Sequence, residues 1–192
     1  MTFRYNPTYI PEVILITPQV FGDERWFFME SYQKHQFQQW GINCEFIQDN
    51  HSKSKKGVFR WFHFQTQHTQ AKLVRVVSWS VLDFAIDSRT NSPTFGQHVM
   101  AFLSAENKQQ LFIPKGFAHW FLTLEDNTEF LYKCDDIYAT EFDSWILYND
   151  PALWINRDTI MHDYNIRELV ISDKDKKLQT LEEYTKNPSF TM

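Results

Sequence analysis

The chain has 192 residues and a formal net charge of −5, with its charged residues scattered along the whole length. This length suits one well-buried core, so we expect a single domain over residues 1–192. No basic block is present that would neutralise a run of phosphates, which excludes a nucleic-acid partner, and no apolar run approaches the roughly 18 residues needed to cross a membrane. Cys44 and Cys134 stand far apart and the N-terminus lacks a basic segment followed by an apolar one. We therefore expect a reduced protein in the cytoplasm.

Short segments rich in β-branched and aromatic residues recur along the chain, separated by clusters of turn-forming residues. These segments are residues 12–17, 25–32, 44–52, 57–64, 71–77, 80–87, 96–104, 109–114, 118–124 and 128–134. Many short strands at regular spacing predict an all-β fold, an antiparallel sandwich or barrel.

Two segments are typical of short helices. The first is "SYQKHQFQQWGI" (31–42), where Gly41 would occupy the position that follows the helix end. The second lies within residues 172–187, where Ser172 or Asp173 would cap the first turn.

The stretch "RWFHFQ" (60–65) brings a guanidinium and an imidazole close together in a predicted strand. In a regular strand Arg60 and Phe62 would share one face and Trp61 and His63 the other, unless a β-bulge intervenes. A single histidine in a strand is more often a satisfied core or rim residue than a functional one, so His63 needs further support.

Three histidines, His63, His68 and His119, raise the possibility of a metal-binding cupin, in which imidazoles project into the mouth of a barrel. The spacing argues against it. Such a site expects His-x-His with a carboxylate a few residues later, and the sequence after His63 offers neither. We expect no metal.

Metal-free proton chemistry is the alternative. It requires a base with a pKa near neutrality, a cation that holds an enolate oxygen, and an acid on the opposite face of the substrate. His63, Lys72 and Tyr132 supply these three types of group.

Several segments spread along the chain resemble those of a known protein family. They are "FGDERWFFMES", "FIQDNHSKSKKGVFRWFHFQ", "QAKLVRV", "VLDFAIDSRTNSPTFGQ", "LFIPKGFAH", "EFLYKCDDIY", "YNDP" and "ISDKD". Together they resemble dTDP-4-dehydrorhamnose 3,5-epimerase, an enzyme of dTDP-L-rhamnose synthesis for cell-surface polysaccharide. The resemblance implies a cupin-type jelly roll, a homodimer, and an isomerase that acts without a cofactor on a dTDP-linked 4-keto-6-deoxy sugar.

The resemblance also implies catalytic roles for four residues. His63 matches the general base, and Asp175 of "SDKD" matches a carboxylate paired with it. Such a carboxylate fixes the imidazole tautomer and stabilises the imidazolium as the proton arrives. Tyr132 matches the acid that reprotonates the enolate, and Lys72 would lie beside the enolate oxygen.

A larger set of residues matches the family's contacts to the nucleotide and the sugar. It comprises Arg25, Glu30, Gln48, Asp49, Asn50, Arg60, Lys72, His119, Tyr138, Asp143 and Lys174. Tyr138 would stack on the thymine ring. Asp143 stands where the family usually has glutamate, which shortens that contact.

Tryptophan stands at six positions where the family pattern has glycine: Trp26, Trp61, Trp79, Trp120, Trp145 and Trp154. Only 5 residues are glycine, far below the usual share of about 7 per cent. Some bacteria read the codon UGA as glycine, and translation of such a gene with a table that reads UGA as tryptophan produces this pattern. Natural divergence and deliberate engineering are the alternatives.

Two other functions stay open at the level of sequence. Relatives within the family invert only C3 or only C5, and the base, cation and acid are shared by all of them. The chain would instead be an inactive sugar-nucleotide binding module if Trp61 and Trp120 blocked its pocket.

Overall fold

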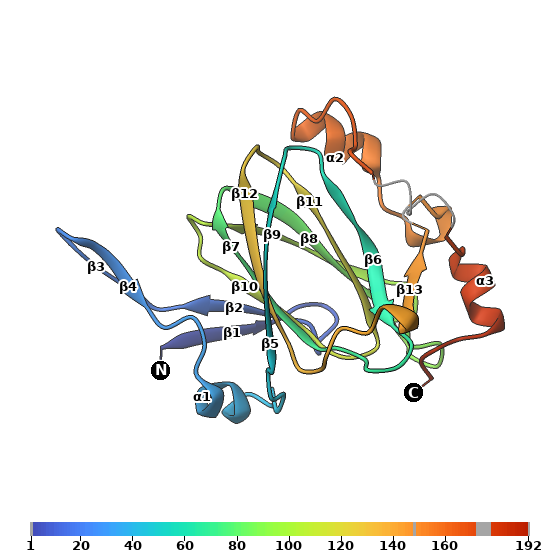
Figure 1. Ribbon diagram of the computed structural model, residues 1–192, viewed down its shortest axis with the longest axis horizontal. Helices are drawn as coiled ribbons and strands as arrows, with labels where there is room; N and C mark the ends of the chain where they lie inside the picture. The colour runs from blue at the N-terminus through green and yellow to red at the C-terminus, as the bar shows by residue number, and fades with distance from the viewer. Residues whose placement is uncertain (1, 148, 172–177, 192) are drawn as a thin grey trace.

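Two antiparallel β-sheets pack face to face in a computed structural model that describes residues 2–147, 149–171 and 178–191, without the side chains of Arg60 and Trp61. A two-stranded hairpin projects away from this sandwich, and short helices lie at its margins (Figure 1). The fold is the cupin-type antiparallel β-sandwich expected from the sequence.

The larger sheet has six strands in the order β1-β2-β10-β7-β12-β5. Their bounds are β1 (Phe3–Pro7), β2 (Ile14–Pro18), β10 (Gln110–Ile113), β7 (Lys72–Ser78), β12 (Thr128–Cys134) and β5 (Gln48–Ser54). Strand β5 is an edge strand, and it pairs with β12 over its whole length.

The smaller sheet has five strands in the order β13-β6-β11-β8-β9. Their bounds are β13 (Asp143–Ile146), β6 (Phe59–Gln65), β11 (Phe117–Thr123), β8 (Ser80–Asp87) and β9 (His98–Ser104). The hairpin consists of β3 (Val20–Asp23) and β4 (Trp26–Met29).

Helices flank the sandwich on two sides. They are α1 (Lys34–Gln39), α2 (Arg157–Asp163), α3 (Leu181–Lys186) and two 3₁₀ turns, η1 (Thr140–Phe142) and η2 (Pro151–Leu153). In Figure 1 both α2 and α3 lie on the side of β6 and β13, far from the hairpin.

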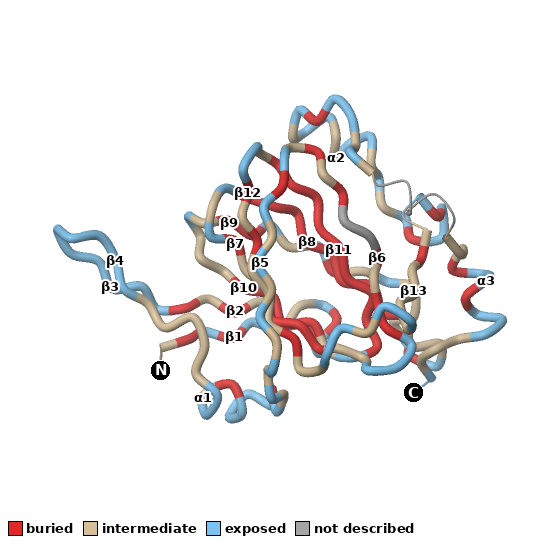
Figure 2. The backbone as a smooth tube through the Cα atoms, in the orientation of Figure 1, coloured by how far each residue is buried: buried red, intermediate tan, exposed pale blue. Residues whose placement is uncertain are grey.

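The apolar core has two main layers around the smaller sheet. One layer lies between the sheets and joins Val74 and Phe130 of the larger sheet to Ala85 and Phe121 of the smaller one. The other covers the outer face of the smaller sheet. Strand β8 is therefore buried at every position (Figure 2), which explains its nearly continuous apolar sequence.

Each of the ten segments expected as strands contains or overlaps a strand of the structure. The sequence did not indicate β1, β3, β13 or α2. Helix α1 lies inside its expected segment, and Gly41 follows it with φ of +81°. Helix α3 begins later than expected, because Thr180 and Glu183 form a capping box at its start. Ser172 and Asp173, the caps expected from the sequence, lie outside the described residues.

Three tryptophans adopt a left-handed backbone conformation. The φ angles are +114° at Trp26, +64° at Trp79 and +54° at Trp154. Glycine enters this region without a steric penalty, whereas a bulky side chain there is an outlier. All three side chains are exposed, so packing against the protein does not offset the backbone strain.

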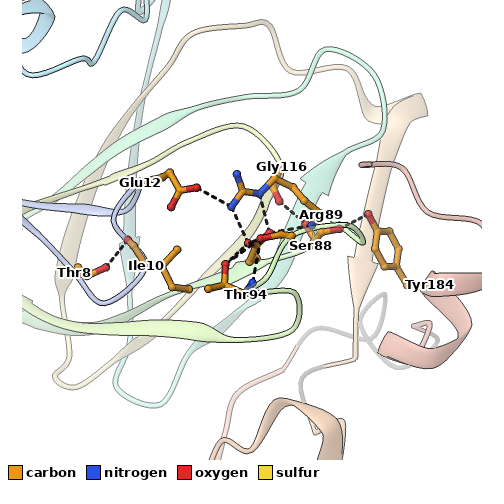
Figure 3. Close-up of polar contacts among 10 residues, drawn as sticks. Thr8, Ile10, Glu12, Ser88, Arg89, Thr94, Gly116 and Tyr184 are labelled. Atoms are coloured by element: carbon orange, nitrogen blue, oxygen red, sulfur yellow. Dashed lines mark hydrogen bonds and ion pairs between the residues drawn. The ribbon is translucent and has the colours of Figure 1, made fainter. Parts of the chain in front are cut away.

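A polar network ties the C-terminal helix to the sandwich (Figure 3). The hydroxyl of Tyr184 in α3 donates to the backbone carbonyl of Ser88 over 2.8 Å, and the Ser88 hydroxyl donates to that of Gly116 over 2.9 Å. Beside them Arg89 forms ion pairs with Asp87 and with Glu12. The network connects α3 to the loop after β8 and to Gly116, which directly precedes β11.

Candidate active site

A cavity of about 390 Å³ lies between the two sheets. Strands β5, β7 and β12 of the larger sheet line it, as do β6 and β11 of the smaller one. Its polar lining residues are Gln48, Asn50, Ser52, His63, Gln70, Lys72, His119, Tyr132 and Tyr138, and the other lining residues are Trp120, Phe121 and Phe130.

Side-chain alternation along β5 decides which of its residues reach the cavity. Gln48 and Asn50 face inward, and the Gln48 Nε2 donates to Asn50 Oδ1 over 3.1 Å. Asp49 faces the opposite way, where its carboxylate lies 2.8 Å from Lys133 Nζ. The family resemblance implied that Asp49 contacts the sugar nucleotide. In this chain the Asp49 side chain lies on the outer surface of the sheet instead.

A β-bulge in β6 sets the direction of its side chains. His63 pairs with His119 of β11, whereas Arg60 pairs with Phe121, so two residues of β6 oppose one of β11. Phe62, one of the two residues in the bulge, packs in the outer core, and His63, the next residue, lines the cavity. The simple alternation expected over residues 60–63 is therefore interrupted.

Asp143 binds the imidazole of His63. Its Oδ1 lies 2.6 Å from His63 Nε2, and its Oδ2 accepts a hydrogen bond of 2.5 Å from the Tyr138 hydroxyl. Strand β13 brings Asp143 to this place by pairing with β6. The family resemblance implied that Asp143 contacts the substrate and that Asp175 is the carboxylate paired with His63. Asp175 lies outside the described residues.

Burial and the positive charge of Lys72 together lower the pKa of His63 to about 4, although Asp143 acts in the opposite direction. His63 is consequently neutral near pH 7. Because Asp143 occupies Nε2, the neutral tautomer with its proton on Nε2 leaves Nδ1 as the basic nitrogen.

A second imidazole and carboxylate pair lies at the cavity wall, where His119 lines the cavity and Asp83 does not. His119 Nε2 is 3.0 Å from both carboxylate oxygens of Asp83, which is completely buried. Burial raises the pKa of Asp83, and the neighbouring His119 and Lys72 counteract the rise. Sequence reasoning missed Asp83, although an aspartate inside the apolar run "SVLDFAID" is a signal that would have found it.

Lys72 is a buried cation at the start of β7. Burial lowers its pKa, and the negative charges of Asp83 and Asp143 are among the effects that raise it again. These two carboxylates therefore favour the ammonium form inside the cavity.

His63 and Tyr132 line the cavity from different sheets. His63 belongs to β6 of the smaller sheet and Tyr132 to β12 of the larger sheet. A ring bound between the sheets would present one face to the imidazole and the other to the phenol. Lys72 lies on the same sheet as Tyr132, with Val74 as the pairing partner of Tyr132 on β7.

Other expected site residues lie elsewhere. Arg25 is at the turn of the β3–β4 hairpin, where its exposed guanidinium pairs with Asp23 over 2.5 Å. Neither Arg25 nor Glu30 lines the cavity of this chain. Lys174 and the side chain of Arg60 are not among the parts of the chain that the structure describes.

The described residues contain no cluster of three or more histidine, cysteine or acidic side chains with the geometry to hold a metal ion. Within the same residues, none of the helices has the length and apolar character that spanning a membrane requires.

A β-sandwich whose cavity combines a neutral imidazole, a buried ammonium and a phenol on facing walls defines a cupin-type acid–base enzyme. A family profile described as dTDP-4-dehydrorhamnose 3,5-epimerase matches residues 7–183. The chain belongs to this family, and it is a carbohydrate epimerase.

Individual relatives agree with this assignment. The chain is 53% identical over 150 residues to the dTDP-4-dehydrorhamnose 3,5-epimerase of Salmonella typhimurium, covering 77% of this chain and 82% of the relative. It is 42% identical to the enzyme of Methanothermobacter thermautotrophicus over 98% of both chains.

Among solved structures, the chain is similar to a dTDP-6-deoxy-D-glucose-3,5-epimerase from Legionella pneumophila, in complex with dTDP-4-keto-L-rhamnose. The TM-score is 0.87 and the identity 43%, over 94% of this chain and 93% of that one. The family, the fold class and the epimerase activity expected from the sequence are thus confirmed.

Proposed function

We propose that this chain inverts C3 and C5 of a dTDP-linked 4-keto-6-deoxy-glucose without a cofactor. The observation that carries the proposal is the placement of a neutral His63 and of Tyr132 on facing sheets around one cavity, with the buried Lys72 beside them. A proton acceptor and a proton donor on opposite sides of a bound ring are what inversion at carbon requires.

Each inversion proceeds through an enolate. The C4 ketone acidifies the C3 and C5 hydrogens, so His63 removes a proton from one face and becomes imidazolium. The electron pair moves to the C4 oxygen, where the Lys72 ammonium stabilises the negative charge. Tyr132 then returns a proton to the opposite face. Solvent takes the proton from His63 and restores the one on Tyr132, so the site is ready for the second carbon.

Asp143 supports the base in this scheme. Its carboxylate holds Nε2 of His63 and stabilises the imidazolium once the proton has arrived. Asp175 is retained as the family-implied partner of the same imidazole. A carboxylate at each ring nitrogen is not compatible with a free base, so we propose that Asp143 holds His63 in the ligand-free chain and that Asp175 acts at a different stage.

The nucleotide and sugar contacts follow the cavity walls. We propose that Gln48, Asn50 and His119 bind the sugar and the diphosphate, and that Tyr138, half exposed at the rim, stacks on the thymine. Arg60 and Lys174 are retained as contacts to the diphosphate. Asp143 is already bonded to the Tyr138 hydroxyl and therefore fixes the orientation of that ring.

We also propose a homodimer. The β3–β4 hairpin exposes large apolar side chains, with Phe21 48% and Phe28 67% exposed. A contiguous exposed apolar patch of this kind is typical of a protein–protein contact. In a dimer the hairpin would pack on the partner subunit. Arg25 and Glu30 would then contribute to a cavity other than that of their own chain, which reconciles their family-implied role with their position here.

The proposed place of action is the cytoplasm, where nucleotide-linked sugars are made. Cys44 and Cys134 are free thiols, as expected for that compartment.

Deuterium incorporation in heavy water tests the proposed reaction. The double epimerase is expected to exchange hydrogen at both C3 and C5 of the substrate, followed by release of the doubly inverted product. Exchange at one carbon only would identify a C3-only or C5-only epimerase. Binding without exchange would identify a sugar-nucleotide binding module and contradict the proposal. Trp120 does not favour the last outcome, because its ring stacks on Phe84 in the outer core and the cavity stays open.

A further inference from the structure

Strand β5 presents four polar side chains toward the interior of the sandwich. They alternate with exposed residues and are Gln48, Asn50, Ser52 and Ser54. Gln48 and Asn50 have hydrogen-bond partners in the structure. The hydroxyl oxygens of Ser52 and Ser54 are buried and have no partner within the described part of the chain.

The two serines differ in one respect. Ser52 lines the cavity, whereas Ser54, one step further along the same face, does not. Across the ladder Ser52 stands opposite Phe130 and Ser54 opposite Thr128. Phe130 also lines the cavity and stacks on Phe121, so Ser52 lies at an aromatic end of the cavity.

A buried hydroxyl without a partner lowers stability, and such a group in a native protein calls for an explanation. Strand pairing does not require an oxygen at position 52, because the side chain of alanine fits the same space. Ser52 lines the cavity, and a serine hydroxyl turns to suit its hydrogen-bond partner. A ligand hydroxyl there would supply the missing hydrogen bond.

We propose that Ser52 is a specificity-determining residue that hydrogen-bonds a hydroxyl of the sugar ring at the aromatic end of the cavity. The proposal rests on the proposed function. The substrate carries hydroxyls at C2 and C3, and only the C2 hydroxyl keeps its configuration while C3 is inverted. A fixed side chain that serves the enzyme throughout both inversions is therefore assigned to the C2 hydroxyl.

The test compares Ser52→Ala with Ser54→Ala as a matched control, because both changes remove a buried, unpartnered hydroxyl from the same face of β5. Each protein is given the dTDP-4-keto-6-deoxy sugar and its 2-deoxy analogue. Ser52→Ala is expected to lower kcat/KM for the full substrate about tenfold, mainly through KM, which corresponds to the loss of one hydrogen bond in a dry site. On the 2-deoxy analogue it should match the wild type. Ser54→Ala should match the wild type on both compounds.

Two controls separate a substrate contact from a structural role. The affinity for dTDP alone, which lacks the sugar, should be the same in all three proteins, and both alanine variants should melt at or above the wild-type temperature. Wild-type kinetics for Ser52→Ala on the full substrate would overturn the proposal, as would an equal loss on the substrate and its 2-deoxy analogue. If the wild type binds the sugar nucleotide but exchanges no hydrogen, the proposed function fails. The same comparison made with dissociation constants then still decides the role of Ser52.

Discussion

The protonation state of His63 is set mainly by the groups that surround its imidazole. An imidazole in water has a pKa of about 6.5 and is partly charged near neutrality. In this cavity burial and the Lys72 ammonium disfavour a second positive charge, and Asp143 compensates only in part. The free enzyme therefore holds a base that is ready to accept a proton, and the anionic enolate that forms next stabilises the resulting imidazolium.

Replacing His63 by alanine should abolish hydrogen exchange at both C3 and C5 while affinity for dTDP stays within a few fold. The base takes part in deprotonation and contributes little to binding of the ground state. Exchange followed by mass spectrometry and calorimetric titration with dTDP would measure the two effects. Rapid exchange in the variant would contradict the role assigned to His63.

The titration of His63 is itself a prediction. Its imidazole signals in an NMR titration should stay those of the neutral form down to pH 5 and change with a midpoint near 4. The folded pKa lies below the unfolded one, so the contribution of His63 to stability is lost as pH falls from about 6.5 through 4. Lys72→Met should raise the midpoint, because it removes a repelling charge. An unchanged midpoint in this variant would show that Lys72 does not act on His63.

Tyr132→Phe should separate the two proton transfers. Deprotonation by His63 survives the loss of the phenol, so hydrogen exchange persists while the doubly inverted product falls by about 100-fold or more, the usual worth of a general acid. Tyr32→Phe is the control, because it removes a phenol that does not line this cavity. Equal loss of exchange and product in Tyr132→Phe would instead assign Tyr132 to positioning.

At the scale of single elements, three turns and strand ends have tryptophan where the backbone conformation favours glycine. Trp26 lies at the start of β4, Trp79 between β7 and β8, and Trp154 directly after η2, all with positive φ. Tight connections of this kind use glycine because it lacks a Cβ. The backbone thus retains a glycine-like conformation at three of the six positions where the family pattern has glycine. This is what the decoding hypothesis predicts.

Glycine at the six positions Trp26, Trp61, Trp79, Trp120, Trp145 and Trp154 should give a more stable and more active protein. Relief of a strained φ is worth about 1 to 3 kcal/mol at each site, so Trp26→Gly, Trp79→Gly and Trp154→Gly together should raise the melting temperature clearly. Trp40→Gly is the control, since Trp40 has an ordinary φ of −101° and stacks on Tyr5. It should lower the melting temperature. The codon hypothesis fails if the tryptophan and glycine forms are equally stable and equally active.

At the scale of the whole molecule, the sandwich supplies its own core and the hairpin does not. Phe21 and Phe28 form a cross-strand pair on β3 and β4, and both remain exposed. The hairpin is the part of the described chain most in need of a covering surface (Figure 2). A second copy would cover it and would bring Arg25 toward the cavity of the partner.

The protein should therefore elute at twice its monomer mass, and the double variant Phe21→Ser, Phe28→Ser should shift it toward the monomer. Affinity for dTDP should fall together with dimerisation if the hairpin completes the partner's site. Val170→Ser, which changes an exposed apolar residue far from the hairpin, serves as control. Light scattering coupled to gel filtration measures the mass, and a monomeric wild type would contradict the homodimer.

The sequence by itself determined the strands, the family and the chemistry of the site. Alternation and β-branched composition located the strands of the sandwich because these patterns are local, and His63, Lys72 and Tyr132 stand in recognisable segments. Alternation along β5 would also have excluded Asp49 from the cavity. The sequence did not predict strands β13 and β3. Each has only four residues, which are too few to establish a period.

Only the tertiary structure decided which carboxylates pair with His63 and His119. Asp143 is 80 positions from His63, and Asp83 is 36 positions from His119. Nothing local in the chain joins them. Strand pairing and the packing of one sheet on the other bring them together, and the bulge in β6 directs His63 inward. The charge states that make the site reactive follow from burial and neighbouring charge, which exist only once the two sheets have closed on each other.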